Sequence, residues 1–188
     1  MRLSPHGTRR LACLTLVLLV NACLPAGRRQ DPRTLTDAEY LRSRELMVPV
    51  HGVSPRQLRD TYNARRSGGR SHNALDIMAR KGTRVLSADD GVVLRVDRNE
   101  LGGKIIYVAD PYRRFVYYYA HLDEWVYPLK AGQHVKRGEL IGSVGTTGNA
   151  PDNAPHLHFQ LMRMTGRQYW DGDPVNPIPY LRKKGEEQ

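Results

Sequence analysis

The stretch PHLHFQL, residues 155–161, alternates polar with apolar side chains. This period of two predicts a β-strand, because successive side chains of a strand point to opposite faces of a sheet. His156, His158 and Gln160 would share one face, while the three apolar residues among them would face the core. Two imidazoles one strand repeat apart fit either an exposed, solvated strand or a site that binds metal or handles protons.

Further short runs with strand character lie upstream, separated by glycine-rich turns. They are 92–97, 104–109, 115–121 and 139–144, with 156–162 as the last of the series. Several short strands at this spacing predict an antiparallel β domain. The expected fold class is mainly β, an antiparallel β-sheet or sandwich-like domain.

Two signals for short helices precede the strands. Thr36-Asp37-Ala38-Glu39 is a capping box, which predicts a helix to about Leu46. Ser54-Pro55-Arg56-Gln57 is a second helix start, with proline in the first turn.

The first 22 residues have the three parts of a secretory signal. Arg2, Arg9 and Arg10 form a basic end, and an apolar run covers residues 11–20. A membrane-spanning helix needs roughly 20 apolar residues, so this run is too short to span. Val20-Asn21-Ala22-Cys23 resembles a bacterial lipobox, in which the cysteine after the cut carries lipid. An ordinary secretory cut after Ala22 is the alternative.

The lipoprotein interpretation predicts an exported protein, anchored in the cell envelope through lipid on Cys23 and facing the periplasm from the outer membrane. The other cysteine, Cys13, would leave with the signal, so the mature body would have no disulfide. The formal net charge is +10, and three leader arginines leave +7 for the body. Such a surface suits an anionic membrane or polymer, and export argues against nucleic acid as a partner.

Two more segments carry candidate site residues. His72-Asn73-Ala74-Leu75-Asp76 places an imidazole and a carboxylate on one side of either a helical turn or a strand. Both groups are good zinc ligands, although such a pair also forms ordinary surface hydrogen bonds. In the run 117–121, Tyr117, Tyr119 and His121 are expected to share a strand face, where a single histidine is most often structural.

Convergence of these segments would create a catalytic site. Two histidines and one aspartate supply three ligands and leave a fourth tetrahedral position for water, as in catalytic zinc sites. The two remaining histidines could transfer protons near neutral pH. Five side chains would then meet the needs of metal-assisted amide hydrolysis.

With these motifs in order, the sequence resembles the lysostaphin/LytM-type zinc endopeptidases, metallopeptidase family twenty-three. The resemblance covers about residues 48–178. The segments that carry it are His72-x-x-x-Asp76, Lys81-Gly82-Thr83, Asp90-Gly91-Val92-Val93, Tyr119-Ala120-His121-Leu122, Ala131 to Gly138, Ile141 to Gly148, and Pro155-His156-Leu157-His158-Phe159.

The resemblance implies a duplicated hybrid motif fold and one zinc ion (Zn2+) per chain. It makes His72, Asp76 and His158 the metal ligands, and His121 and His156 the catalytic pair. The implied activity is hydrolysis of peptide cross-links or stem peptides in bacterial peptidoglycan, with any regulatory protein unknown. The alternative is a wall-bound activator of a cell-wall amidase that cleaves nothing itself.

The expected organisation follows from these assignments. Residues 1–22 form the lipoprotein-type signal peptide and 23–35 a tether. Residues 36–47 form the N-terminal helix, 48–181 the zinc metallopeptidase domain, and 182–188 a charged tail. Outside the five site residues, His134 is expected in a solvated turn, and His51 has no evident partner. Arg70 would either contact a substrate carboxylate or remain solvated.

Overall fold

The structure is a computed structural model that describes residues 30–65, 69, 71–166 and 168–181. The chain divides into two units, Met1–Gln30 and Asp31–Gln188, and every element named below belongs to the second. The expected signal peptide, the lipidated Cys23 and the charged tail lie outside the described residues. Within the described ranges, no helix combines the length and the apolar character needed to cross a membrane.

The described chain is built mainly from strands, with short helices near its two ends. In chain order the elements are α1 (Asp37–Arg44), a 3-10 turn (Pro55–Gln57), β1 (Leu75–Met78), β2 (Arg84–Leu86), β3 (Gly91–Asn99), β4 (Gly103–Ala109), β5 (Phe115–Trp125), β6 (His134–Val135), β7 (Leu140–Val144), β8 (His156–Arg163), β9 (Asp173–Val175) and α2 (Ile178–Leu181).

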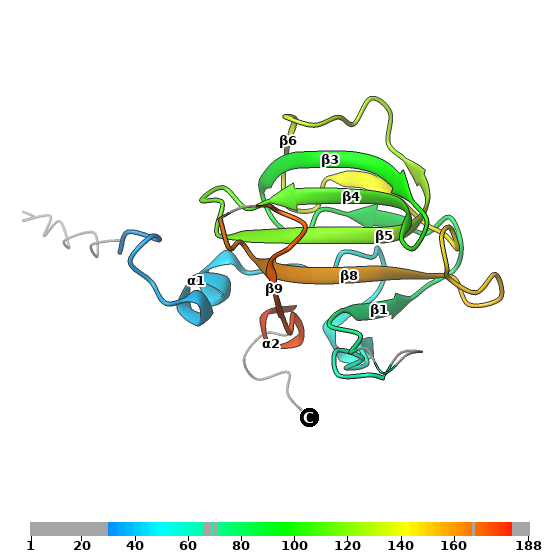
Figure 1. Cartoon of the computed structure of the whole chain (residues 1–188), viewed down its shortest axis with the longest axis horizontal. Coiled ribbons are helices and arrows are strands. Elements are labelled where there is room, and N and C mark those ends of the chain that lie inside the picture. The colour runs from blue at the N-terminus through cyan, green and yellow to red at the C-terminus, as the bar shows by residue number, and fades with distance from the viewer. Residues whose placement is uncertain (1–29, 66–68, 70, 167, 182–188) are drawn as a thin grey trace, which may run out of the picture. The chain divides into compact units, whose positions relative to one another are not determined.

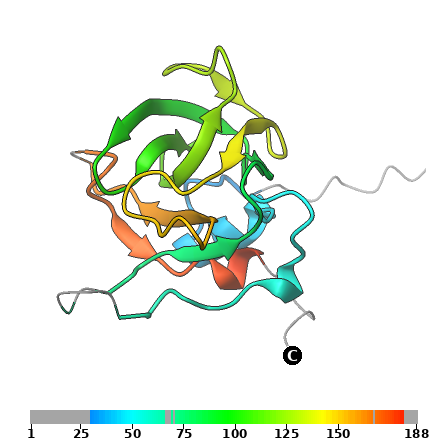
Figure 2. The same ribbon diagram turned by 90° about the vertical axis from the view of Figure 1, so that its right-hand side faces the viewer.

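The strands form an antiparallel sheet in the order β1-β8-β5-β4-β3-β6, seen side by side in Figure 1. β9 pairs with residues 161–163 of β8, beyond the part of β8 that pairs with β1. β7 pairs with both β2 and β5. Figure 2 shows how the sheet curls so that β7, in yellow, comes back beside the green strands. The predicted fold class, mainly β and antiparallel with short helices, is confirmed.

Residues 156–161 lie in strand β8, and their side chains alternate between the two faces of the sheet as predicted. Leu157, Phe159 and Leu161 are fully buried in the core, and the polar residues between them lie on the other face. The five predicted runs correspond to β3, β4, β5, β7 and β8. Strands β2, β6 and β9 were not predicted, because two or three residues are too few to show a period.

The N-terminal helix forms with both hydrogen bonds of its capping box. The Thr36 side chain accepts from the Glu39 amide, and the Glu39 carboxylate accepts from the Thr36 amide. The helix ends at Arg44, two residues before the expected Leu46, because Glu45 adopts a left-handed conformation with φ 50°. The second helix-start signal produces only the single 3-10 turn.

Candidate metal centre

The structure brings three of the predicted site residues into one cluster. Asp76 on β1 is the register partner of His158 on β8, and His72 lies just before β1. The Asp76 Oδ1 atom lies 3.0 Å from His72 Nε2 and 3.1 Å from His158 Nδ1, and the two imidazole nitrogens are 3.1 Å apart. The choice between helical turn and strand is thereby decided: β1 is a strand, and His72 stands beside it rather than in it.

The donor atoms fit a tetrahedral zinc ion. Zinc bonds of 2.0–2.2 Å at tetrahedral angles put neighbouring ligand atoms roughly 3.3–3.6 Å apart, a few tenths of an ångström more than the 3.0 and 3.1 Å observed here. Two imidazoles and one carboxylate are a donor set that zinc accepts, and three protein ligands leave one position for water or substrate. The residues could therefore hold a zinc ion with small adjustments of their side chains.

Thr61, which lies outside the cluster, forms hydrogen bonds with His72 and Asp76. Its carbonyl accepts a hydrogen bond from His72 Nδ1 at 2.8 Å, so the proton of that ring is on Nδ1 and the Nε2 lone pair faces Asp76 and His158. Its hydroxyl accepts from the Asp76 amide at 2.9 Å. Such outer partners fix the tautomer and orientation of metal ligands. The sequence contains no signal for Thr61, because a backbone carbonyl is available at every residue.

The electrostatics of the cluster keep the Asp76 carboxylate ionised and the His158 imidazole neutral. Burial raises the pKa of Asp76, but the imidazoles of His158 and His72 outweigh burial and hold that pKa well below its ordinary value. Burial also lowers the pKa of His158, against the opposing effect of Asp76. An ionised carboxylate and a neutral imidazole are the forms that bind a metal ion.

The expected face of His121 was wrong. Tyr119 is buried in the core, whereas His121 lines a cavity on the opposite face, together with Tyr118 and Ala120. The cause is a bulge in β5, where the register with β4 shifts and His121 adopts φ 60°. A bulge adds one residue to a strand, so the side chains beyond it change face.

His121 and His156 are oriented in the same way as His72. The Nδ1 atom of His121 donates to the Thr147 carbonyl, and that of His156 to the Ala154 carbonyl, each at 2.8 Å. In the neutral form of either ring, this hydrogen bond leaves Nε2 as the nitrogen without a proton. The His156 Nε2 atom lies 3.6 Å from Asp76 Oδ1. The centroids of the His121 and His156 rings are 4.9 Å apart. Burial lowers the pKa of His121 to about 4, despite its hydrogen bond to Thr147, so this imidazole is neutral at neutral pH.

The loop that carries Thr147 is packed tightly against the β3–β4 turn. The Thr147 hydroxyl accepts from the Lys104 amide and donates to the Leu122 carbonyl. A side chain at Gly103 or Gly148 would collide with the backbone of the other segment. The carbonyl that orients His121 is therefore fixed by close backbone contacts, a role that only the folded chain reveals.

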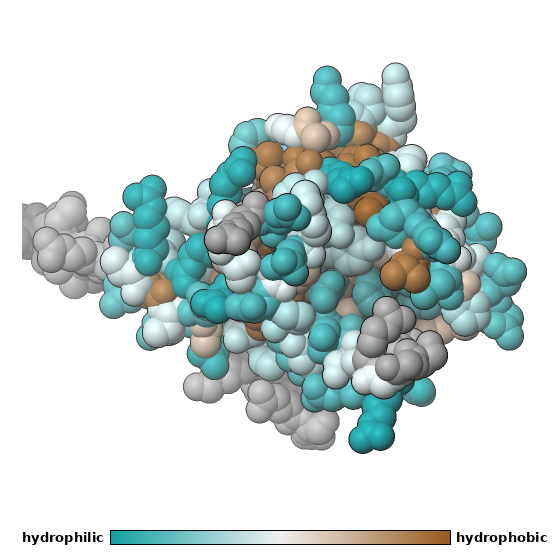
Figure 3. Space-filling model, viewed as in Figure 1, coloured by the Kyte–Doolittle hydropathy of each residue, from teal (hydrophilic) through white to brown (hydrophobic). Residues whose placement is uncertain are grey.

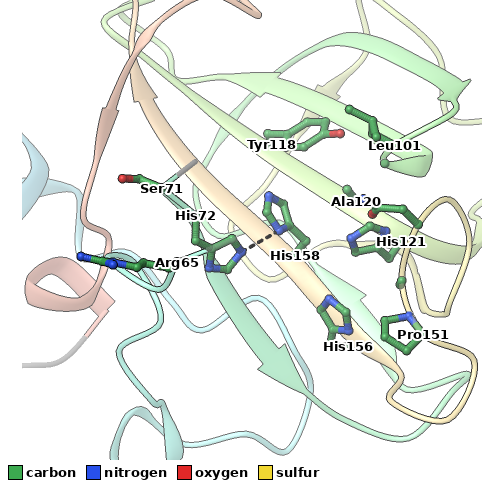
Figure 4. Close-up of a pocket in the computed structure, with 13 residues that line it drawn as sticks. Arg65, Ser71, His72, Leu101, Tyr118, Ala120, His121, Pro151, His156 and His158 are labelled. Atoms are coloured by element: carbon green, nitrogen blue, oxygen red, sulfur yellow. Dashed lines mark hydrogen bonds between the residues drawn. The ribbon is translucent and has the colours of Figure 1, made fainter. Parts of the chain in front are cut away.

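A cavity of about 580 Å³ opens over the cluster. Figure 4 shows four imidazoles facing it, two from β8, one from β5 and one from the segment before β1, with Tyr118 and Leu101 along one side and Arg65 beyond His72. The described lining residues are Arg65, Ser71, His72, Leu101, Gly102, Tyr118, Ala120, His121, Asn149, Ala150, Pro151, His156 and His158. The five predicted site residues thus meet around one place, and their individual roles stay predictions.

The other singled-out residues lie away from this cavity or outside the described chain. His134 is exposed, as expected, although it begins strand β6 rather than sitting in a turn. His51 is exposed, and its amide donates to the Arg84 carbonyl. Arg70 lies outside the described residues.

Comparisons with known proteins agree on one family. The model of peptidase family M23 matches residues 70–177. The L-Ala–D-Glu endopeptidase of Bacillus subtilis (strain 168) is 38% identical over 126 residues, which make up 64% of this chain and 37% of that protein. This chain therefore spans well under half the length of that relative.

Solved structures give the same result at the level of the fold. The catalytic domain of the antimicrobial peptidase lysostaphin from Staphylococcus simulans matches with a TM-score of 0.57 and 28% identity, over 66% of this chain and 91% of that one. A zinc-containing peptidase from Vibrio cholerae matches with a TM-score of 0.57 and 27% identity, over 74% of this chain and 40% of that one.

Proposed function

Because the chain belongs to peptidase family M23, we propose that it is a zinc-dependent endopeptidase that hydrolyses peptide bonds of bacterial peptidoglycan. The observation that carries this proposal is the convergence of four imidazoles on one cavity, with the Asp76 carboxylate within 3.6 Å of three of them. His72, Asp76 and His158 would hold the metal, and His121 and His156 would act beside it. The names of relatives support the substrate class, since one acts on L-Ala–D-Glu and another is a peptidoglycan endopeptidase.

When bound, a zinc ion supplies Lewis-acid activation of water and of the substrate carbonyl. The protein side of the mechanism is the handling of protons and charge at two imidazoles. The Nε2 atoms of His121 and His156 can each accept a proton, because their Nδ1 atoms are already committed to backbone carbonyls. Once protonated, either ring can donate to a developing oxyanion or to the leaving amine.

The zinc requirement and the hydrolysis are tested together with purified protein and purified cell wall. We expect about one zinc per chain, clearing of wall material in a zymogram, loss of clearing with a chelator, and recovery with added zinc. Mass analysis of the released muropeptides would identify the bond that is cut.

The rival proposal, a non-cleaving activator of an amidase, predicts no clearing by the zinc-loaded protein alone and clearing only when the amidase is added. All five site positions are filled by residues able to act, which favours the enzyme. An unstructured protein substrate should be cut far more slowly than muropeptides if the wall is the target.

We also propose that the protein is exported and anchored by lipid on Cys23. This rests on the basic end, the apolar run and the Val20-Asn21-Ala22-Cys23 tetrapeptide. Replacing Cys23 by Ser should release the protein from membranes, whereas an ordinary secretory cut after Ala22 predicts the same soluble protein with or without the substitution. Mass spectrometry of the mature N-terminus distinguishes these outcomes.

A further inference from the structure

A row of side chains crosses the sheet beside the metal centre, on the same face. Arg95, Tyr107, Tyr118 and Gln160 are consecutive register partners on β3, β4, β5 and β8. Residues directly opposite each other in antiparallel strands share a face. Gln160 is two residues from His158, so this row lies one strand repeat from the metal ligands, about 6.7 Å away.

Aromatic rings continue from this row to the surface. The Tyr118 ring lies 6.0 Å from the His158 ring and 4.5 Å from the Tyr107 ring. Tyr169 lies 5.3 Å from Tyr107, and Trp170 lies 4.7 Å from Tyr169. We call Tyr107, Tyr118, Tyr169 and Trp170 the aromatic platform. It begins in the lining of the catalytic cavity, through Tyr118, and ends at Trp170, which is 47% exposed.

The chemistry of this surface is amphipathic rather than aliphatic. The three tyrosines are partly exposed, and planar polar groups stand at the two ends of the row. Asp97 pairs with the Arg95 guanidinium, and the Arg95 side chain stays 45% exposed. In Figure 3 the surface over β4, β5 and β8 is mostly pale or teal, as expected for tyrosine, glutamine and arginine.

A sugar ring matches these features. Its C–H faces are apolar and suit the flat face of an aromatic ring, while its hydroxyls project around the rim and suit amide and guanidinium groups. An apolar protein segment would instead suit an aliphatic surface, because such a segment has few groups that could form hydrogen bonds with an amide or a guanidinium. Peptidoglycan joins its peptides covalently to a glycan, so a sugar is available close to the bond that the proposed function cleaves.

We propose that the aromatic platform binds a saccharide of the wall glycan while the attached peptide occupies the cavity at the metal centre. This rests on the proposed function. An extended peptide covers about 3.3–3.6 Å per residue, so roughly two residues span the gap of one strand repeat between platform and metal ligands. Sugar and scissile peptide can therefore be held at once.

The first test uses two substrates that share one stem peptide, with and without its N-acetylglucosaminyl-N-acetylmuramyl disaccharide. The protein should prefer the disaccharide form by about tenfold in kcat/KM, mainly through KM. Trp170→Ala and Tyr107→Leu should reduce that preference to about twofold. Tyr127→Ala is the matched control, because Tyr127 is 94% exposed and outside the platform, and the preference should stay tenfold.

The second test measures binding without catalysis. The chain has two tryptophans, Trp125 and Trp170. A tetramer of β-1,4-linked N-acetylglucosamine should change the tryptophan fluorescence of the full chain in a saturable way. Tyr107→Leu should weaken this binding about tenfold, and Tyr127→Ala should leave it unchanged.

The outcomes separate this inference from the proposed function. Equal cleavage of both substrates, or equal slowing of both by Trp170→Ala, would overturn the saccharide assignment and leave the peptidase intact. The second result would mean that the platform binds peptide. If the zinc-loaded protein cleaves neither substrate yet binds the tetramer through Tyr107, the peptidase proposal fails and saccharide binding stands.

Discussion

Two clusters of buried polar side chains lie on opposite faces of β5. One is the candidate metal centre, on the face of Tyr118 and Ala120. The other, the anchor cluster, is formed by Tyr40, Arg44, Asp89, Asp110 and Tyr117, and it joins α1 to the sheet. The two clusters contain similar groups, carboxylates with cations or rings, but they use them differently.

In the anchor cluster the protein itself satisfies the charges. The Arg44 guanidinium donates to both Asp89 oxygens at 2.8 Å, and Tyr117 donates to the same carboxylate. Asp110 accepts from the Tyr40 hydroxyl and from the amides of Arg114 and Phe115. Paired and hydrogen-bonded charges can be buried without large cost.

In the metal centre, backbone groups orient the rings from outside, and the inner atoms of His72, Asp76 and His158 contact one another. Backbone carbonyls take the Nδ1 protons of His72, His121 and His156, which turns the other nitrogen of each ring toward the cavity. The anchor cluster is therefore expected to stabilise the fold, whereas the metal centre faces a cavity where a metal ion and a substrate can bind. Substitutions in the anchor cluster should lower the free energy of unfolding. Substitutions in the metal centre should change metal binding or turnover.

The largest effect is expected from Asp76→Ala. This removes the oxygen that lies about 3 Å from two imidazole nitrogens, so bound zinc and wall hydrolysis should both fall below detection. Zinc content by mass spectrometry and clearing of wall material are the measurements. His134→Ala, which removes an exposed imidazole, should leave both unchanged. Retention of one zinc by the Asp76 variant would contradict the ligand assignment.

His121→Ala should separate metal binding from catalysis. We expect about one zinc per chain to remain while kcat falls by about 10²–10⁴-fold, the usual contribution of a general acid or base. The measurements are zinc content and turnover of a muropeptide. His51→Ala, at an exposed imidazole, is the control. Full activity of the His121 variant on purified wall would show that this residue has no catalytic role.

Arg44→Ala should act on stability alone. It leaves the Asp89 carboxylate, whose side chain is 2% exposed, without its ion-pair partner, which costs about 3–5 kcal/mol. Urea unfolding of the mature protein measures this change. Zinc content and turnover per folded molecule should stay as in the unaltered protein. Arg56→Ala, at an exposed arginine, should leave the free energy of unfolding unchanged. If Arg56→Ala lowered that free energy as much as Arg44→Ala, the anchor cluster would have no special role in stability.

The smallest effect is expected at the start of α1. Thr36→Ala removes the side-chain oxygen that accepts from the Glu39 amide, which should lower the free energy of unfolding by about 1 kcal/mol. Thr36→Ser keeps an oxygen there and should recover most of the loss. A change in wall hydrolysis by either variant would mean that α1 influences the metal centre, against the separation of the two clusters.

The sequence by itself determined the features that local patterns encode. The alternation in residues 155–161 predicted β8 and the common face of His156 and His158, because strand geometry places every second side chain together. The Thr36–Glu39 capping box predicted α1, because its two hydrogen bonds form within one turn. The family motifs indicated which five side chains to look for.

Only the tertiary structure decided how those residues meet. The bulge at His121 moves its side chain to the cavity face, and a strand period read from sequence cannot reveal an extra residue in the ladder. The contacts made by the Thr61 and Thr147 carbonyls, the Arg44–Asp89 pair and the aromatic row each join residues 11 or more positions apart in the chain. Such contacts depend on strand pairing and register, which are set by packing of the whole sheet rather than by any one segment.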